Sequence, residues 1–351
     1  MNIPMPASWY TDPRVFERER SSVFGRSWLI ACHRSDVAQP GDYVTLDVGG
    51  RDIFVVHGTD GAVRAFHNVC QHRAHRLLDG RGRLKVSLTC PYHAWTYGLD
   101  GSLRTAPHAD DQPGFDRGCF GLEPVRSVIF AGFVMVCLDA GTPLPAQSPL
   151  GALEAMLRRD HPKLDAMTPV YRREATIAAN WKTIIENYLE CYHCDVAHPS
   201  FGNFDLSTWK HVVGDGWSRQ GRVPPGTADR DVDHATMIGL SAWWQWPNIF
   251  WARALDADSF VAVSHEPLAP DSTRQVRTVY AMGAASGAMD RFNELFDRVF
   301  AEDVGVVEAV QRGLASPGYR GGVLVEQPEA RSGWSEHGVR HFHDLVRAAL
   351  A

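Results

Sequence analysis

The sequence predicts an α+β protein with two main domains, and three observations support this prediction. Short strand-like runs broken by glycine turns fill residues 28–140. Beyond residue 151, helical patterns and further strand-like runs share the chain. Between these parts, the proline- and glycine-rich segment GTPLPAQSPLG (141–151) has the composition of a linker. With 351 residues, the chain is long enough to form two hydrophobic cores.

Local patterns justify each element in order. Residues 11–27 form an amphipathic pattern with a proline near its start, which predicts a short helix. Runs such as YVTLDV and SVIFAGFVMVCLD predict the strands of the first domain. The later elements are a helix near 150–160, a strand near 170–179, a helix near 181–197, strands around 245–283 and a helix over about 290–314. We therefore expect an N-terminal helix (1–27) that packs on the C-terminal domain (141–351), and a β domain (28–140) between them.

Composition argues against several classes of function. The net charge of −6 offers no electrostatic reason to bind nucleic acid or an anionic membrane. No apolar run is long enough for a bilayer span, and the start MNIPMPASWY lacks the form of a signal peptide. The seven cysteines are an odd number, and four of them lie close to histidines in the sequence. In a chain without an export signal this favours metal binding over disulfides, so we expect a location in the reducing cytoplasm.

The most informative pattern is Cys70-x-His72 followed by Cys90-x-x-His93. Two cysteines and two histidines are common ligands of structural zinc, which is the alternative reading of this pattern. Here, however, each loop pairs a cysteine with a histidine, whereas zinc fingers usually pair cysteine with cysteine and histidine with histidine. Strand patterns and glycines flank both loops, and the hairpin that begins at Trp95 could close over a buried cluster. The pattern therefore favours an iron–sulfur cluster with mixed ligation.

These loops resemble the Rieske iron–sulfur domain, whose CPYHGW element appears here as CPYHAW. The resemblance implies that Cys70 and Cys90 bind one iron of a [2Fe-2S] cluster, and that His72 and His93 bind the other. Neutral imidazoles raise the reduction potential to roughly −150 to +300 mV, against about −400 mV for plant-type ferredoxins. The nearby residues His67 and His75 fall outside the pattern, and we expect them to be ordinary hydrogen-bonding residues.

A second metal pattern lies in NWKTIIENYLECYHCDVAHPSF (180–201). Glu190 and His193 are three residues apart, so on a helix they would share a face. His193 and His198 are five apart and would diverge by about 140° on a straight helix. They can bind one metal only if the helix ends or widens between them, and Pro199 favours such a break. Two histidines with a distant carboxylate form the facial triad of non-haem Fe(II) oxygenases.

The distant carboxylate is expected on the helix over about 290–314, which offers Glu302, Asp303 and Glu308. The apolar stripe of this helix has Asp303 at its middle, Glu302 near its edge and Glu308 on the opposite side. A carboxylate aimed into a core needs a cation, so Asp303 is our choice for the third ligand. A buried salt bridge between Asp303 and an arginine stays open as the alternative.

The pair Cys191-x-x-Cys194 could form a redox disulfide. It brackets the candidate ligand His193, however, and lacks a thioredoxin-like setting. We therefore do not expect these two cysteines to form a disulfide.

The second pattern resembles the helix-grip catalytic domain of Rieske oxygenase α subunits. By this resemblance His193, His198 and Asp303 match the iron ligands, and Glu190 matches an acidic residue that bridges the two metal centres. In ring-hydroxylating dioxygenases that residue is usually aspartate. Glutamate is shared with the branch that acts on quaternary ammonium compounds, typified by carnitine monooxygenase and glycine betaine oxygenase. The stretches NYLECYHC and SEHGVRHFH also look like that branch.

The resemblance also implies partners. Activation of O₂ at a single Fe(II) in a monooxygenase needs two external electrons, and the chain has no G-x-G-x-x-G fingerprint of a nicotinamide or flavin site. We therefore expect a separate NAD(P)H-dependent reductase of the flavin or ferredoxin type. Family members form head-to-tail homotrimers, in which Glu190 would accept hydrogen bonds from His193 and from His93 of the partner subunit.

Aromatic residues suggest the substrate. Phe201, Phe204 and Trp209 follow the candidate iron ligands, and WWQWPNIFW occupies 243–251. Aromatic faces bind quaternary ammonium groups, so we expect N-demethylation or C–N cleavage of a carnitine- or betaine-like compound. The alternatives are an aromatic-ring-hydroxylating dioxygenase α subunit, a Rieske electron-transfer protein and a structural zinc protein.

Overall fold

The computed structural model describes residues 4–109, 111–201, 205–227, 231–233, 237–254, 258–284, 286–327 and 331–351. The side chains of residues 201 and 238–240 are also outside this description. The chain forms two compact units. The smaller unit is Phe24–Pro143, and the larger unit combines the residues up to Val23 with Leu144–Ala351.

The smaller unit is built on antiparallel strands. Its seven-stranded sheet has the order β1-β10-β9-β4-β3-β2-β5, and a three-stranded sheet has the order β6-β7-β8. The strands are β1 (Leu29–His33), β2 (Asp42–Val48), β3 (Arg51–His57), β4 (Val63–His67), β5 (Arg81–Arg83), β6 (Ser87–Thr89), β7 (Thr96–Gly98), β8 (Leu103–Thr105), β9 (Pro124–Phe130) and β10 (Phe133–Cys137). A core that includes Phe54, Phe66 and Trp95 surrounds Cys70 and Cys90, so the cysteines are held in a rigid apolar setting.

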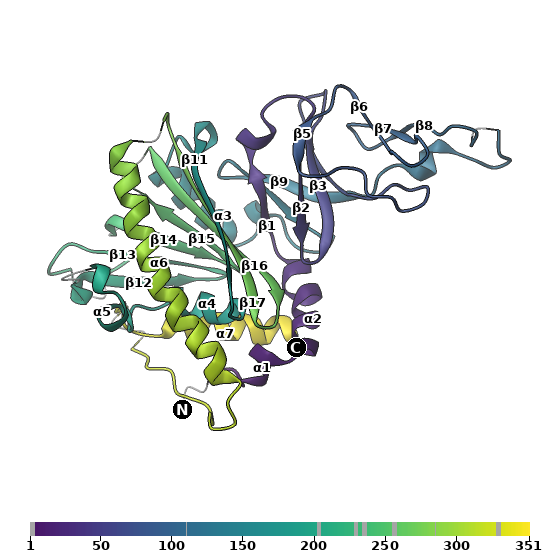
Figure 1. Cartoon of the computed structure of the whole chain (residues 1–351). Helices are drawn as coiled ribbons and strands as arrows, with labels where there is room; N and C mark the ends of the chain where they lie inside the picture. The colour runs from purple at the N-terminus through teal and green to yellow at the C-terminus, as the bar shows by residue number, and fades with distance from the viewer. Residues whose placement is uncertain are drawn as a thin grey trace. The chain divides into compact units, whose positions relative to one another are not determined.

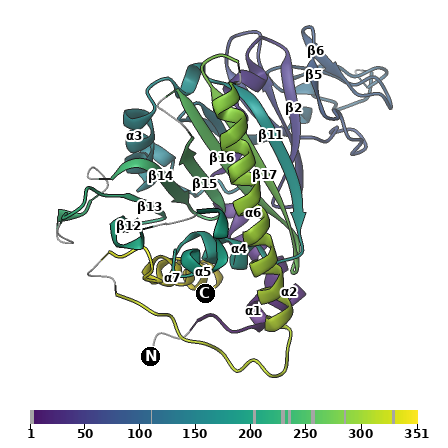
Figure 2. The same cartoon turned by 60° about the vertical axis from the view of Figure 1, so that its left-hand side comes forward.

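The larger unit has one antiparallel sheet covered by helices, and the α+β prediction is confirmed. The sheet has the order β11-β17-β16-β15-β14-β13-β12. Its strands are β11 (Thr168–Ile177), β12 (Trp209–Gly214), β13 (Trp217–Arg222), β14 (Ile238–Gln245), β15 (Ile249–Arg253), β16 (Ser259–Ala269) and β17 (Ser272–Ala281). Its helices are α1 (Ser8–Thr11), α2 (Pro13–Ser22), α3 (Leu150–Asp160), α4 (Trp181–Tyr188), α5 (Cys194–Ala197), α6 (Gly287–Leu314) and α7 (His337–Leu350). Figures 1 and 2 show α6 lying across one face of this sheet.

Helices α3 and α6 confirm the prediction, and two other helices differ from it. The helix expected over 11–27 is shorter, because α2 spans only Pro13–Ser22. Asp12 is extended, separates α2 from α1, and caps α2 by accepting a hydrogen bond from Arg14 N (2.8 Å). The expected helix 181–197 is also wrong as one element, because α4 ends at Tyr188 and α5 begins at Cys194. No described helix has the length and apolar character that a membrane crossing requires.

The end of α4 has an identifiable cause. The N–H of Cys191 donates to the carbonyl of Gly333 (2.7 Å) instead of continuing the helical ladder. Residues 189–193 therefore form a turn, and our explanation that Glu190 and His193 share a helix face is wrong.

Helix α4 is held by both ends of the chain. Glu19 on α2 pairs with Lys182 Nζ and accepts a hydrogen bond from Trp181 Nε1 (2.9 Å). On the next turns, Glu186 accepts hydrogen bonds from Tyr10 Oη (2.5 Å) and from His343 Nε2 on α7 (2.9 Å). These buried and half-buried contacts fix the helix that leads into the candidate metal site.

Candidate metal centres

The two Cys/His loops of the smaller unit share one backbone shape. Cys70 follows β4 and Cys90 follows β6. In each loop the cysteine carbonyl accepts from the N–H four residues later, at Ala74 and at Ala94 (3.0 Å each). The cysteine N–H donates to the carbonyl five residues later (2.9 and 2.8 Å). Ala74 and Ala94 have φ of 54° and 59°, a left-handed conformation that costs a residue with a Cβ roughly 1–2 kcal/mol.

The side chains of these loops converge on one small volume. Cys70 and Cys90 are each 2% exposed and carry free thiols, and the rings of His72 and His93 lie 4.6 Å apart. His93 Nδ1 is buried without a hydrogen-bond partner among the described residues, an arrangement that is costly unless the nitrogen binds a metal. Two thiols beside two imidazoles are the donor set of a Rieske cluster, so these four residues fit that group.

Tyr97 is a functional candidate that our reading of the sequence missed. Its hydroxyl lies 3.2 Å from Cys70 Sγ and accepts a hydrogen bond from Gln71 N (3.0 Å). Burial raises the pKa of Tyr97, so the phenol keeps its proton and can donate it to the sulfur. Hydrogen bonds to ligand sulfurs tune the potential of such clusters.

In the larger unit, the turn after α4 orients His193. Its Nδ1 donates to Glu190 Oε1 (2.5 Å), while Glu190 Oε2 accepts from the N–H groups of Tyr192 and His193. A carboxylate held this way fixes the imidazole tautomer and directs Nε2 to the opposite side. Asn187 Nδ2, which we did not predict, lies 3.3 Å from that Nε2.

The three predicted iron ligands meet at this point. His193 Nε2 lies 3.6 Å and His198 Nε2 3.3 Å from Asp303 Oδ1 on α6. His198 ends α5 with φ −114° and ψ 75°, and its Nδ1 donates to Glu302 Oε2 (3.0 Å). Among the described residues, the ion pairs of Asp303 are with these imidazoles and not with an arginine. Glu308 lies elsewhere and accepts from Ala178 N (3.0 Å).

The electrostatics of this cluster suit a cation. Burial opposes charge on His193, but the carboxylates of Asp303 and Glu190 outweigh it and raise the pKa of His193 to about 9. Burial alone would raise the pKa of Asp303, yet its interactions with the two nearby imidazoles hold that pKa below its usual value. Asp303 is therefore an anion at neutral pH. Two imidazoles and one carboxylate fit a mononuclear iron ion and leave coordination positions for other ligands.

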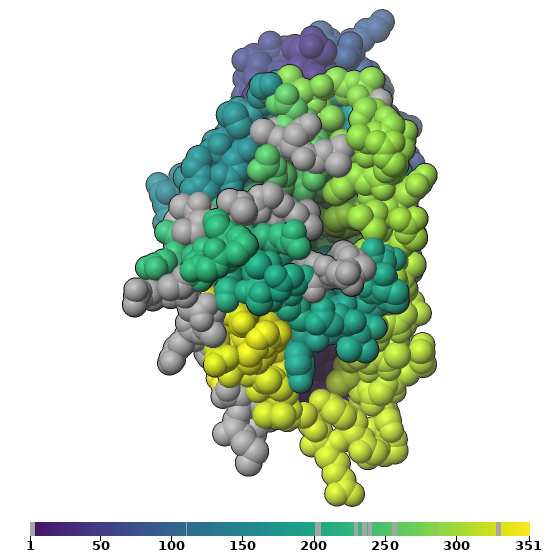
Figure 3. Space-filling view, turned by 90° about the vertical axis from the view of Figure 1, so that its left-hand side faces the viewer, coloured from purple at the N-terminus to yellow at the C-terminus, as the bar shows by residue number. Residues whose placement is uncertain are grey.

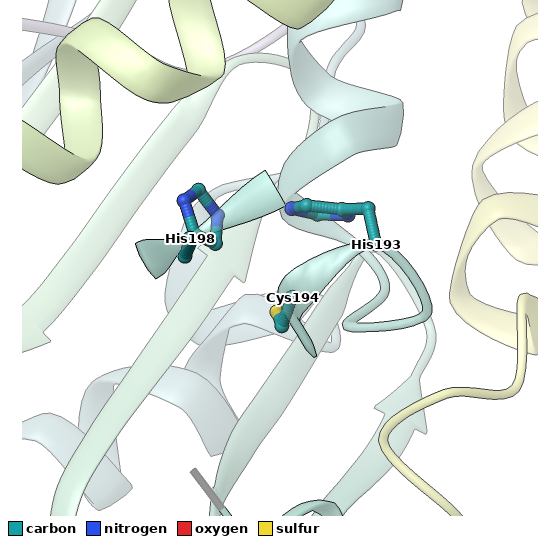
Figure 4. A group of neighbouring side chains, drawn as sticks. All are labelled: His193, Cys194 and His198. Atoms are coloured by element: carbon teal, nitrogen blue, oxygen red, sulfur yellow. The ribbon is translucent and has the colours of Figure 1, made fainter. Parts of the chain in front are cut away.

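Cys191 and Cys194 form a disulfide, so our expectation that they would not was wrong. Cys191 lies in the turn that follows α4, and Cys194 is the first residue of α5. Cys194 N donates to Cys191 O (3.2 Å), and the two Cα atoms are 5.0 Å apart. Figure 4 shows the rings of His193 and His198 directed toward one another, with the Cys194 sulfur close to both. The potential ligand atoms of these three residues lie within 4.8 Å of one another.

An apolar cavity of about 200 Å³ adjoins the candidate iron ligands. Its lining from α6 includes Phe292, Phe296 and Phe300, and other aromatic faces come from Tyr188 and Trp209. The apolar stripe predicted for this helix did not reveal the cavity, because a core-facing stripe and a cavity-facing stripe have the same period.

The predicted aromatic set is only partly correct. Trp209 lines the cavity, whereas Trp243, Trp244 and Trp251 are at most 1% exposed and belong to the core. Phe204 and the side chain of Phe201 lie outside the described residues.

A second cavity of about 290 Å³ lies on the other side of the turn that carries Glu190 and His193. Figure 3 shows it as a hollow bordered by α7 and by the teal and yellow-green segments, with N-terminal residues at its floor. Glu186, Glu190 and Glu336 line it, and burial together with these neighbouring carboxylates raises the pKa of Glu336. The turn between the two cavities is therefore reachable from both sides.

Known proteins resemble this chain in sequence and in fold. Residues 27–116 match the Rieske [2Fe-2S] domain, and residues 164–351 match the catalytic domain of the ring hydroxylating alpha subunit. The chain is 36% identical over 347 residues to the carnitine monooxygenase oxygenase subunit of Escherichia coli (strain K12), covering 97% of this chain and 92% of that protein. It is 30% identical over 359 residues to the chloroplastic choline monooxygenase of Spinacia oleracea, covering 98% and 78%. The crystal structure of the quaternary ammonium Rieske monooxygenase CntA with L-carnitine has a TM-score of 0.88 and 33% identity, covering 99% of this chain and 96% of that chain.

Proposed function

Because this chain belongs to the Rieske non-haem iron oxygenase α subunits, with a [2Fe-2S] cluster and a mononuclear iron as cofactors, we propose that it hydroxylates a quaternary ammonium compound. Hydroxylation of a carbon next to the positive nitrogen gives N-demethylation or C–N cleavage. In balanced form, the substrate R–H, O₂, two electrons and two protons give R–OH and water.

The proposal assigns a role to each candidate residue. Cys70, His72, Cys90 and His93 hold the cluster, and His193, His198 and Asp303 hold the iron. When bound, the iron supplies the activation of O₂, with electrons delivered by the cluster. Glu190 keeps His193 in one tautomer and orientation, and Glu302 does the same for His198. The apolar lining of the adjoining cavity excludes water from the reacting carbon.

The electron supply requires partners. We infer an NAD(P)H-dependent reductase and a head-to-tail homotrimer, in which the cluster of one subunit serves the iron of the next. A relative of this chain is a quaternary ammonium Rieske monooxygenase described in terms of inter-subunit electron transfer, which supports this inference. We also propose a cytoplasmic location, where Cys70 and Cys90 stay available as thiolates. The Cys191–Cys194 disulfide must then resist the reductants of that compartment, and the burial of both cysteines (5% exposed) limits access to it.

The observation that carries the substrate proposal is the aromatic cavity beside Asp303. Among the residues that the structure describes, five aromatic side chains line it: Tyr188, Trp209, Phe292, Phe296 and Phe300. A trimethylammonium group cannot donate a conventional hydrogen bond, and each aromatic face contributes roughly 0.5–2 kcal/mol to binding it. Relatives of this chain are named for their action on carnitine, choline and glycine betaine.

A substrate panel tests the proposal. The purified oxygenase with a reductase and NADH is offered carnitine, γ-butyrobetaine, glycine betaine, choline and naphthalene, while O₂ uptake and hydroxylated products are measured. We expect coupled turnover with at least one quaternary ammonium compound. The matched control is the neutral carbon isostere of choline, in which a quaternary carbon replaces the nitrogen, and it should bind at least tenfold more weakly. A cis-diol from naphthalene without turnover of any ammonium compound would instead support an aromatic-ring dioxygenase.

A further inference from the structure

The disulfide of the larger unit involves a residue that is also a potential metal ligand. The sulfur of Cys194, one ring nitrogen of His193 and one ring nitrogen of His198 lie within 4.8 Å of one another. Figure 4 shows these three side chains. Cys194 is bonded to Cys191, so its sulfur is not a thiolate in this structure. The state of this one bond therefore decides whether Cys194 can present a thiolate beside the two imidazoles.

The location of the pair allows its state to act on the site. Both cysteines are 5% exposed and line the apolar cavity next to the candidate iron ligands. The carbonyl of Cys194 accepts a hydrogen bond from His198 N (3.2 Å), so the cysteine and the histidine are parts of one compact turn. A short rotation of the Cys194 side chain after bond cleavage would turn its sulfur toward the imidazoles.

Ligand chemistry predicts the effect of a free Cys194 thiolate. Two imidazoles and one carboxylate suit Fe(II) and leave coordination positions open for O₂ and water. Adding a thiolate gives four protein ligands of the types that zinc prefers in closed tetrahedral sites. Thiolates are soft ligands, and the stability order of divalent metals already places Zn²⁺ above Fe²⁺. A fourth ligand would therefore favour zinc and block the position at which O₂ is activated.

We propose that the Cys191–Cys194 disulfide withdraws the Cys194 sulfur from the metal site and so keeps the site selective for iron. A dithiol reductant reverses this protection. It transfers two electrons and two protons to the disulfide, the S–S bond breaks into two thiols, and the reductant becomes its own cyclic disulfide. The proposal rests on the iron site proposed above, because it concerns competition for the same ligands.

Metal competition tests the proposal without any assay of turnover. Protein with an assembled cluster and an emptied mononuclear site is used as the oxidised form, or reduced with dithiothreitol that is then removed under argon. Each form receives equimolar Fe²⁺ and Zn²⁺, and bound metals are counted by elemental analysis with the cluster iron subtracted. We expect the ratio of bound zinc to iron to rise at least tenfold on reduction.

Two matched variants separate ligation from structure. Cys191→Ser and Cys194→Ser both abolish the disulfide, but only Cys191→Ser leaves a thiol at position 194. Cys191→Ser should favour zinc under both treatments, whereas Cys194→Ser should keep the ratio of the oxidised wild type. With cobalt(II) in place of iron, a thiolate-to-metal charge-transfer band should appear in Cys191→Ser and be absent in Cys194→Ser.

The outcomes are distinct. If both variants shift the metal ratio equally, the disulfide acts only through structure and the proposal is overturned. If the ratio does not depend on redox state or variant, the proposal fails while the iron site stands. If no form binds either metal outside the cluster, the proposed iron site is wrong and the inference falls with it.

Discussion

Replacing Lys182 by methionine should lower the free energy of unfolding of the larger unit by about 3–5 kcal/mol. Lys182 and its partner Glu19 are both 0% exposed, and their pairing joins α4 to α2. The substitution leaves the carboxylate buried, with a hydrogen bond from Trp181 Nε1 as its remaining described polar contact. Desolvation of an unpaired charge is the dominant cost, because methionine fills nearly the same volume as lysine.

A double variant distinguishes this cost from lost packing. Lys182→Met with Glu19→Gln removes both charges and keeps an amide oxygen that can accept from Trp181 Nε1. Most of the lost stability should return, to within about 1–2 kcal/mol of the wild type, since neutral replacement of a buried pair is often tolerated.

Urea titration followed by tryptophan fluorescence supplies the measurement, with equal m-values as the condition for comparing the variants. A loss below about 1 kcal/mol in the single variant would refute the reasoning. A double variant as unstable as the single one would point to packing and not to charge. Because α4 leads into the turn with Glu190 and His193, the single variant should also lose mononuclear iron sooner than the wild type on dialysis.

Four further predictions concern the metal sites and pH. Asp303→Ala should lose the mononuclear iron but retain the visible spectrum of the cluster, and elemental analysis that finds normal iron would contradict its role as a ligand. Glu190→Ala should keep both metals yet lose coupled turnover by at least about 10–100-fold, and normal steady-state activity would disprove this. Ala94→Gly should stabilise the smaller unit by about 1 kcal/mol, because glycine adopts φ 59° without strain. Thermal loss of cluster absorbance checks it, and an unchanged midpoint would argue against strain. Burial lowers the pKa of His265 from 6.5 to about 4, so the folded state favours the neutral ring. Stability should therefore be full above pH 6.5 and fall by about 3 kcal/mol as the pH drops to about 4. In the His265→Gln variant, the urea midpoint should change less with pH between 6.5 and about 4. An unchanged dependence of the midpoint on pH would exclude His265 as the cause.

The sequence predicted the parts of this protein that depend on short local patterns. Both Cys/His loops are continuous motifs, and α6 has a long amphipathic pattern, so the positions of these elements could be predicted from the sequence. The choice of Asp303 over Glu302 also followed from that period, and the structure places Asp303 between His193 and His198.

The remaining features depend on contacts between distant residues. The end of α4 is set by the bond from Cys191 N to the carbonyl of Gly333, which no local pattern reveals. The same turn brings Cys194 to Cys191, so the disulfide was missed with it. The cavity lining was misassigned because burial in a core and exposure to an enclosed cavity select the same aromatic side chains. Phe296 and Trp251 are both aromatic, but Phe296 lines the cavity and Trp251 is buried in the core.

The contacts that both ends of the chain make with α4 have a consequence for the biosynthesis of the protein. Glu186 accepts hydrogen bonds from Tyr10, near the start of the chain, and from His343 on α7. Because α7 is the last helix to be synthesised, the hydrogen bond from His343 can form only late in translation. His193 and His198 leave the ribosome before α6 brings Asp303 and before α7 closes over α4. A metal ion that arrived in that interval would meet two histidines without their carboxylate and could be lost or exchanged. The complete set of three ligands can therefore assemble only after α6 has been synthesised and has docked onto the growing fold.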